Sequence, residues 1–318
     1  MSTLIKSFLG GLIVLSFPMA LLVVVDSLIV DFVATGANAL FTLVQAALVL
    51  LLLRLSPMWP TKAHPMWVVS CLAWGAIGSI GLTLLIAMPT AEVAIKLGVP
   101  SLQYPLSGGY PEEITKGIGV LMIVCAFRCI NRPWHGLVTG MLVGMAFDVC
   151  ENFTYAAQGA LMNPESDLFG VLETWGTRTL FGPGLHMMFA GFTGYGIGLA
   201  LFAIGRSKWW RVRVGVFWLL FAFVTHFSWN LIAAEIFYGV IFATLVAYPT
   251  FISLIVVSWR QARRDSGYLS VQLQSGYSTP IGPEKPALTA PATNASALEL
   301  VPVSVPLPVL TDPDPHPQ

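Results

Sequence analysis

Polar side chains interrupt several long apolar stretches of this sequence, and they are of the types that enzymes use for hydrolysis. The candidate site residues are Glu112, Glu113, Glu151, Asn152, His186, His226 and Asn230. A carboxylate can activate water while histidine and asparagine side chains stabilise the developing oxyanion. Glutamate and histidine can also hold a metal ion that keeps one position open for water. The residue types leave both mechanisms open, and both predict hydrolysis.

The first candidate group is the sequence Pro111-Glu112-Glu113-Ile114-Thr115-Lys116, at the start of a predicted helix. Acidic residues stabilise a helix N-terminus, and Glu112 can pair with Lys116 four residues later, so a purely structural role is one interpretation. Two adjacent carboxylates repel each other, however, and in apolar surroundings one of them would retain its proton. Such a carboxyl group is a common general acid or base, which is the functional interpretation.

Glu151 lies deep within the next predicted helix, 136–160. It is about 15 residues from the start of that helix, which corresponds to roughly 22 Å at a rise of 1.5 Å per residue. Asp148 and Asn152 lie on broadly the same helical face, at spacings of three and four residues. A glutamate at this depth cannot reach either end of the helix, so the position favours a functional role.

The two histidines have weaker signals when each is taken alone. His186 follows Gly182-Pro183-Gly184, and a single histidine in a glycine-rich helix is usually a hydrogen-bonded packing residue. His226 and Asn230 are four residues apart and therefore share one helical face, where they could bind a carbonyl oxygen or neighbouring side chains.

The composition requires that these residues lie in a membrane protein. Hydrophobic residues make up 56% of the 318 residues and charged residues only 10%, whereas soluble domains have about 25% charged residues. This composition excludes a soluble enzyme, a nucleic-acid-binding protein and a disulfide-stabilised secreted domain. The four cysteines lie in apolar stretches without metal-binding spacing, which is typical of packing residues.

The fold class predicted is all-α, a polytopic membrane bundle of about eight transmembrane helices. A span needs about 20 apolar residues, and eight segments qualify by this criterion. They are 8–30, 33–53, 67–88, 113–131, 136–160, 178–204, 214–234 and 237–258.

The positive-inside rule predicts that both ends of the chain are cytoplasmic. Twelve of the sixteen basic residues then lie on the cytoplasmic side: Lys6, Arg54, Lys62, Arg128, Arg132, Arg206, Lys208, Arg211, Arg213, Arg260, Arg263 and Arg264. Only Lys96 and Arg178 are expected in the outer loops.

With this orientation, candidate residues on four different helices lie at a similar depth in the outer half of the bilayer. Glu113 begins an inward helix, Glu151 lies high on an outward helix, and His186 lies about eight residues into an inward helix. His226 lies about twelve residues along an outward helix. A single shared site explains this common depth better than four packing residues that happen to coincide. The sequence therefore predicts a hydrolytic site inside the membrane.

Together these residues resemble the motif set of the PrsW family of intramembrane proteases and, more loosely, the CAAX-processing and bacteriocin-processing membrane proteases. The motifs are Glu112-Glu113-x-x-Lys116, Phe147-x-x-x-Glu151-Asn152, His186 and His226-x-x-x-Asn230. The resemblance covers about residues 104–235. We therefore expect a protease-like core of helices in 104–259, preceded by N-terminal helices in 1–103. A basic, then Pro-rich cytoplasmic tail in 260–318 is expected to be disordered, because ten of the 22 prolines lie between Pro280 and Pro317.

The resemblance implies an endopeptidase of a bacterial cell membrane that cleaves single-span membrane proteins near their extracytoplasmic face, as in the cleavage of an anti-sigma factor. It implies catalytic roles for Glu112, Glu113 and Glu151, with His186, His226 and Asn230 as ligands or oxyanion donors. If a metal such as Zn²⁺ is bound, the candidate ligands are Glu113, Glu151, His186 and His226. No nucleic-acid partner is expected.

Buried Glu, Asp and His residues also form proton relays in membrane transporters, so the same residues fit a second class of function. The alternative is therefore a proton-coupled transporter. The sequence shows no repeat between its two halves, which many carriers have, and this favours the protease.

Overall fold

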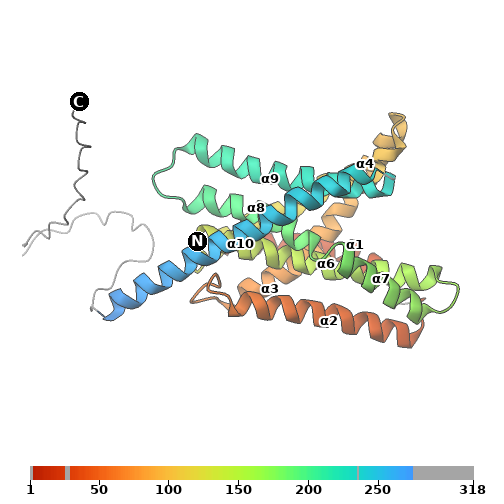
Figure 1. The fold of residues 1–318 in the computed structure, drawn as a ribbon, viewed down its shortest axis with the longest axis horizontal. Helices are drawn as coiled ribbons and strands as arrows, with labels where there is room; N and C mark the ends of the chain where they lie inside the picture. Colours follow the sequence, from red (N-terminus) through yellow and green to blue (C-terminus); the bar gives the residue numbers. More distant parts are fainter. Residues whose placement is uncertain (1–2, 26–28, 235, 275–318) are drawn as a thin grey trace, which may run out of the picture. The chain divides into compact units, whose positions relative to one another are not determined.

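The computed structural model describes residues 3–25, 29–234 and 236–274, and all regular structure in these residues is helical (Figure 1). The α-helices are α1 (Thr3–Val25), α2 (Phe32–Leu55), α3 (Pro65–Ala73), α4 (Ile80–Lys96), α5 (Tyr110–Ala126), α6 (Pro133–Met162), α7 (Asp167–Phe181), α8 (Leu185–Phe202), α9 (Lys208–Asn230) and α10 (Phe237–Gln274). Short π or 3-10 turns connect some of them: η2 (Trp74–Ser79), η3 (Pro100–Leu102), η4 (Pro105–Gly109) and η5 (Leu231–Ala234). The predicted all-α class is confirmed.

Within the part of the chain that the structure describes, six helical segments are long and apolar enough to cross a membrane, so the chain is an integral membrane protein. They are Thr3–Leu22, Phe32–Leu55, Pro65–Lys96, Leu185–Phe202, Lys208–Ala233 and Phe237–Asp265. The third of these combines α3, η2 and α4. Helices α5 and α6 occupy the predicted fourth and fifth spans, but polar and small residues lower their hydropathy and other helices bury most of their side chains.

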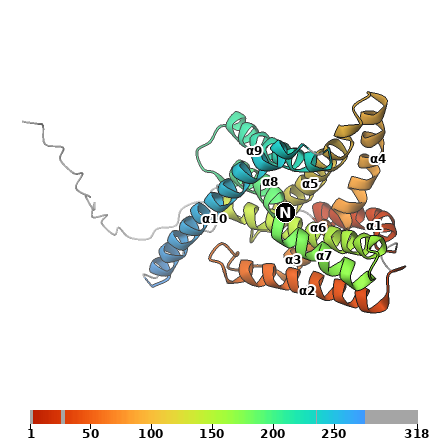
Figure 2. The same cartoon turned by 45° about the vertical axis from the view of Figure 1, so that its right-hand side comes forward.

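Helices α6 and α8 pack closely in the middle of the bundle (Figures 1 and 2). Gly136, Gly140 and Gly144 of α6 are spaced four residues apart and face the backbone of α8. A methyl group on Gly140 would lie 2.1 Å from the carbonyl oxygen of Ala190, and one on Gly144 would lie 2.1 Å from that of His186. Glycine is therefore required for this approach, which holds the backbone of His186 against α6.

The predicted sixth span, 178–204, is wrong as a single helix. The structure divides it at Gly182-Pro183-Gly184 into α7 and α8, and Gly184 has a φ angle of +64°, in the left-handed region that glycine adopts without strain. His186 is consequently the second residue of α8 and does not lie eight residues into a helix. Arg178 belongs to α7 and does not lie in an outer loop.

Contacts of two basic side chains, one with an aromatic ring and one with a carboxylate, show which helix ends lie together. The Lys6 ammonium lies 5.1 Å from the centre of the Phe127 ring, which brings the start of α1 to the end of α5. Arg132, just before α6, binds Asp265 of α10 at 2.9 Å. These basic residues therefore lie at helix ends, as the positive-inside argument requires.

Helix α10 crosses the bundle obliquely and continues to Gln274, so the first part of the predicted disordered tail is helical (Figure 1). The Pro-rich remainder, from residue 275, lies outside the described residues.

The α6–α8 contact predicts the effect of adding one methyl group. Gly140→Ala places a methyl carbon against the Ala190 carbonyl and should lower the free energy of unfolding by about 1–3 kcal/mol, measured by unfolding in mixed detergent micelles. Gly176→Ala in α7 is the control, because a methyl group there meets no atom within 4 Å. That substitution should be neutral or should stabilise the helix by about 0.5–1 kcal/mol. Equal effects of the two substitutions would contradict this packing.

Candidate active site

Helix α5 presents both of its glutamates to the interior from its first turn. The helix begins at Tyr110, Pro111 in its first turn has a suitable φ angle, and acidic side chains are favourable near the positive end of the helix dipole. Glu113 is fully buried and Glu112 is 8% exposed. Ion partners must therefore come from neighbouring residues, because buried carboxylates without them are strongly destabilising.

Lys116 supplies that partner one turn further along α5. Its Nζ lies 2.6 Å from Oε1 of Glu113 and 3.6 Å from Oε2 of Glu112, and its side chain is fully buried. The same ammonium group lies 3.1 Å from Nδ1 of His186 and over the Phe147 ring. The Glu112–Lys116 pair considered from the sequence is present, but the shorter ion pair is with Glu113.

Each histidine of the cluster is oriented by a carboxylate. Nδ1 of His226 lies 2.8 Å from Oε1 of Glu113, and Nε2 of His186 lies 2.8 Å from Oε2 of Glu151. An ionised carboxylate only accepts hydrogen bonds, so these two ring nitrogens carry protons. In the neutral form of each ring, the lone pair is then on Nε2 of His226 and on Nδ1 of His186.

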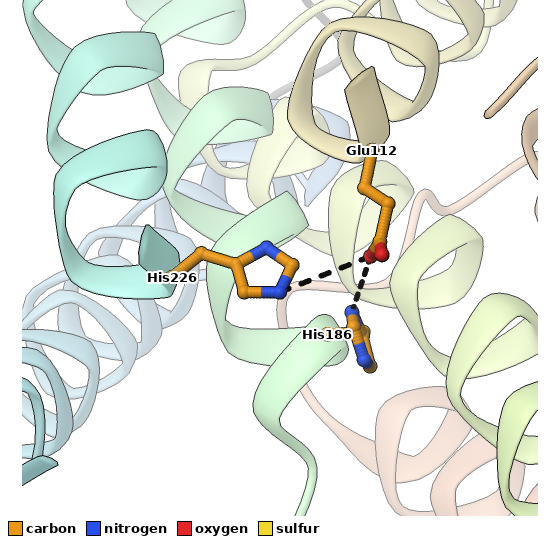
Figure 3. A group of neighbouring side chains, drawn as sticks. All are labelled: Glu112, His186 and His226. Carbon is orange, nitrogen blue, oxygen red and sulfur yellow. Dashed lines mark ion pairs between the residues drawn. The ribbon is translucent and has the colours of Figure 1, made fainter. Parts of the chain in front are cut away.

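Both lone pairs face Glu112 (Figure 3). Its Oε2 lies 3.4 Å from Nδ1 of His186 and 3.9 Å from Nε2 of His226, and it has no hydrogen bond from any described residue. The three residues offer ligand atoms that all lie within 4.8 Å of one another, so they form a group that could hold a metal ion. Glu113 and Glu151, which the sequence suggested as ligands, instead bind the far nitrogens of the two histidines.

A second polar network begins at Glu151. Arg178 of α7 donates to Oε2 of Glu151 at 2.6 Å through Nη2 and to Oδ1 of Asn152 through Nε. Nδ2 of Asn152 lies 3.2 Å from Oε1 of Gln45 and 3.4 Å from Oδ2 of Asp148, and Gln45 also donates to Asp148 at 2.7 Å. Asn152 therefore lies on the far side of Glu151 from Glu112.

Asn230 approaches Glu112 from the end of α9. A methyl group on Gly108 would lie 2.6 Å from Nδ2 of Asn230 and 3.3 Å from Oε1 of Glu112, so both side chains lie against this glycine. The structure thus places an amide donor near the free carboxylate.

A cavity of about 620 Å³ gives access to the cluster from one side. Glu112 and Glu151 supply its carboxylates, and Tyr104, Phe147 and Tyr155 supply aromatic walls. A cavity with few polar groups in apolar walls is the usual form of a substrate site.

The structure brings together Glu112, Glu113, His186 and His226 directly, with Glu151 bonded to His186 and Asn230 beside Glu112. Sequence reasoning missed Arg178, which was assigned to a loop, and Gln45, which lies in a predicted span with little else that is polar. The signal for Gln45 was present: with Asn38, it is one of two amide side chains in an otherwise largely apolar helix. Nothing in the sequence identified its partner.

A helical membrane protein that encloses carboxylates and histidines beside a cavity has the architecture of an intramembrane hydrolase. The profile of the PrsW family intramembrane metalloprotease matches residues 63–257, and the chain belongs to this family. The protein is therefore a peptidase, and its substrates are membrane proteins. No curated protein and no solved structure gives a match.

The family match is wider than the motif region 104–235. It includes the span formed by α3, η2 and α4 and most of α10, whereas α1 and α2 lie outside it. Membership in a peptidase family also favours proteolysis over the proton-coupled transporter considered from the sequence.

The buried position of Lys116 predicts a large loss of stability when its charge is removed. Lys116→Met leaves Glu113 buried without its cation, which should lower the free energy of unfolding by about 3–5 kcal/mol, measured by unfolding in mixed micelles. Lys96→Met is the control, because Lys96 forms the same type of pair with Glu92, but both side chains are largely exposed. An exposed pair contributes about 0–1 kcal/mol. A Lys116→Met loss no larger than that of the control would show that Glu113 does not depend on this cation.

Proposed function

We propose that the protein is a zinc-dependent intramembrane endopeptidase that cleaves single-span membrane proteins near their extracytoplasmic face. One observation carries this proposal: two imidazole lone pairs and one carboxylate oxygen without a hydrogen bond converge within 4.8 Å. A buried carboxylate oxygen without a hydrogen bond needs an explanation, and a bound cation or substrate that supplies the missing contact is one.

The donor set fits a divalent metal. Two histidines and one glutamate, with a fourth position for water, are the ligands of many catalytic zinc sites. The far nitrogen of each histidine is bound by a carboxylate, Glu113 for His226 and Glu151 for His186, as is usual around metal-bound histidines. Glu112, His186 and His226 would hold the ion. When bound, it would supply an acidified water molecule and a Lewis acid for the peptide carbonyl.

The other candidate residues then have distinct roles. Glu113 and Glu151 fix the orientation and the proton position of the two imidazole rings. Asn230, whose amide nitrogen lies beside Glu112, is placed to donate a hydrogen bond to the oxyanion of the tetrahedral intermediate. Lys116 keeps Glu113 ionised, because its ammonium group lies 2.6 Å away. Asn152 does not contact the three proposed ligands in this role; it accepts a hydrogen bond from Arg178, which in turn binds Glu151.

A metal ion and the Lys116 ammonium group approach the same atom, Nδ1 of His186. The shortest contact of Lys116 is with Glu113, at 2.6 Å, and this contact uses none of the three proposed ligands. Lys116 can therefore retain its ion pair with Glu113 while His186 Nδ1 binds a metal.

The orientation proposed from the basic residues places the site in the outer half of the bilayer. In α6, Glu151 is the eighteenth residue from Pro133, which corresponds to about 27 Å of helix at 1.5 Å per residue. The hydrocarbon core is about 30 Å thick. With the start of α6 on the cytoplasmic side, this depth supports cleavage toward the extracytoplasmic end of a substrate helix.

Loss of Glu112 should remove both metal and activity. Glu112→Gln should lower cleavage of a tagged single-span substrate by at least about 100-fold and should lower the zinc content of the purified protein, measured by elemental analysis. Glu92→Gln is the control, because Glu92 is an exposed glutamate and should leave both quantities unchanged.

Chelation separates the two mechanisms that the residue types left open. Exhaustive chelation should abolish cleavage by the parent protein, and added Zn²⁺ should restore it. If the chelated, metal-free protein cleaves at the parent rate while Glu112→Gln is inactive, Glu112 acts as a base without a metal. If Glu112→Gln cleaves at the parent rate, the proposed site is wrong.

The position of the cut tests the orientation. Mass spectrometry of the products should locate the cleaved peptide bond near the extracytoplasmic end of the substrate helix. A cut at the cytoplasmic end would contradict either the orientation of the bundle or the depth of the site.

A further inference from the structure

Two side chains from separate helices bind the same oxygen of Glu151. Arg178 Nη2 of α7 lies 2.6 Å from Oε2, and His186 Nε2 of α8 lies 2.8 Å from it. Arg178 is not part of the motif set given above, and its side chain is 27% exposed, so its charge is largely withdrawn from solvent. Burying a guanidinium group to this extent has a desolvation cost, so an arginine at such a position is expected to have a specific partner that offsets this cost.

The interruption between α7 and α8 makes this shared contact possible. Arg178 and His186 are eight positions apart, which in a continuous helix would separate them by about 12 Å along the axis. The turn at Gly182-Pro183-Gly184, with Gly184 in the left-handed region, shortens that separation. The chain geometry that divides the predicted span therefore also brings the guanidinium group to Glu151.

Further contacts fix the guanidinium group itself. Its Nε donates to Asn152, and the group lies 4.3 Å from the centre of the Tyr155 ring. Asn152 is bound in turn by Gln45 of α2, a helix outside the family match. Arg178 is thus held by Glu151, Asn152 and Tyr155. A continuous chain of hydrogen bonds runs from Gln45 of α2 through Asn152 and Arg178 to Glu151.

We propose that Arg178 is a positioning residue for the peptidase reaction: it holds Glu151 in place so that His186 directs Nδ1 toward Glu112. This inference rests on the proposed function of the same site. Arg178 acts through Glu151, because Glu151 binds the nitrogen of His186 that faces away from Glu112. Its two donors, Nη2 and Nε, bind adjacent residues of α6, which a lysine cannot reproduce because it provides only a point charge.

The kinetic test compares three variants with the parent. Arg178→Met should lower kcat about 10–100-fold, the usual effect of losing a residue that orients a ligand, with KM little changed. Arg178→Lys retains the charge and should recover part of the loss. Arg213→Met is the control, because Arg213 is an exposed arginine of α9 whose loss changes the net charge equally.

A double variant tests whether Arg178 acts through Glu151. Arg178→Met combined with Glu151→Gln should be no less active than Glu151→Gln alone, because the second substitution already removes the group that Arg178 holds. A multiplicative loss in the double variant would overturn the inference, as would parent-like kcat in Arg178→Met.

A spectroscopic test does not depend on proteolysis. The chain has five histidines, so selective ¹⁵N-histidine labelling gives few signals, and His186→Asn assigns that of His186. In the parent, His186 should show one tautomer, protonated at Nε2. After removal of metal by chelation, the signal should shift toward exchange between tautomers in Arg178→Met, and more weakly in Arg178→Lys, relative to the equally chelated parent.

The two readouts distinguish failure of the inference from failure of the proposed function. If the parent cleaves no substrate, the proposed function fails, and the His186 signal alone decides the inference. If His186 has the same signal in the parent, Arg178→Met and Arg178→Lys, Arg178 does not position it. If Arg178→Met does not fold, Arg178→Lys decides the question in both measurements.

Discussion

The site depends on one constraint: carboxylates buried in a lipid-embedded bundle need cations. Glu113 is paired with Lys116, and Glu151 with Arg178, at 2.6 Å in each case. Asp148 is held by the amides of Gln45 and Asn152. Glu112 is the carboxylate whose nearest charged group, Lys116, is already bound more closely by Glu113. The pairing of its neighbours therefore leaves Glu112 as the group available to a metal ion or a reacting water.

The same constraint explains how the two histidine rings are oriented. Each ring has a carboxylate on one nitrogen, and His186 also has an ammonium group near the other. A ring with a donor on one side and an acceptor on the other has only one tautomer that satisfies both. Hydrogen bonding thus determines where each lone pair points, and the close backbone contact of α6 with α8 determines where His186 is.

The sequence was sufficient to predict the all-helical membrane fold and most members of the cluster. Glu112, Glu113, His186 and His226 could be found because charged and imidazole groups stand out in apolar segments. Glu151 could be placed by counting helical residues. These arguments use only helix rise, the cost of buried charge and residue type, which do not depend on tertiary contacts.

The remaining features depend on contacts between distant segments. The predicted span 178–204 gave undue weight to the apolar length of the segment, although Gly-Pro and Pro-Gly pairs such as those in Gly182-Pro183-Gly184 commonly mark turns. Arg178 was therefore assigned to a loop. Gln45 and Asn152 are 107 positions apart, so no local pattern relates them. The distances alone show that Glu112 has only the longer contact with Lys116, at 3.6 Å, while Glu113 has the shorter one, at 2.6 Å.

The interruption before α8 has an electrostatic consequence of its own. A helix that begins at Leu185, in the interior of the bundle, has first-turn amide groups without partners within the helix and a partial positive charge at that end. Discontinuous membrane helices in transporters use such ends to stabilise anions. The backbone of α8 therefore contributes positive potential beside Glu151 and Asp148. Neither a change of protonation nor a single substitution removes this potential, whereas either can remove the charge of an ionisable side chain.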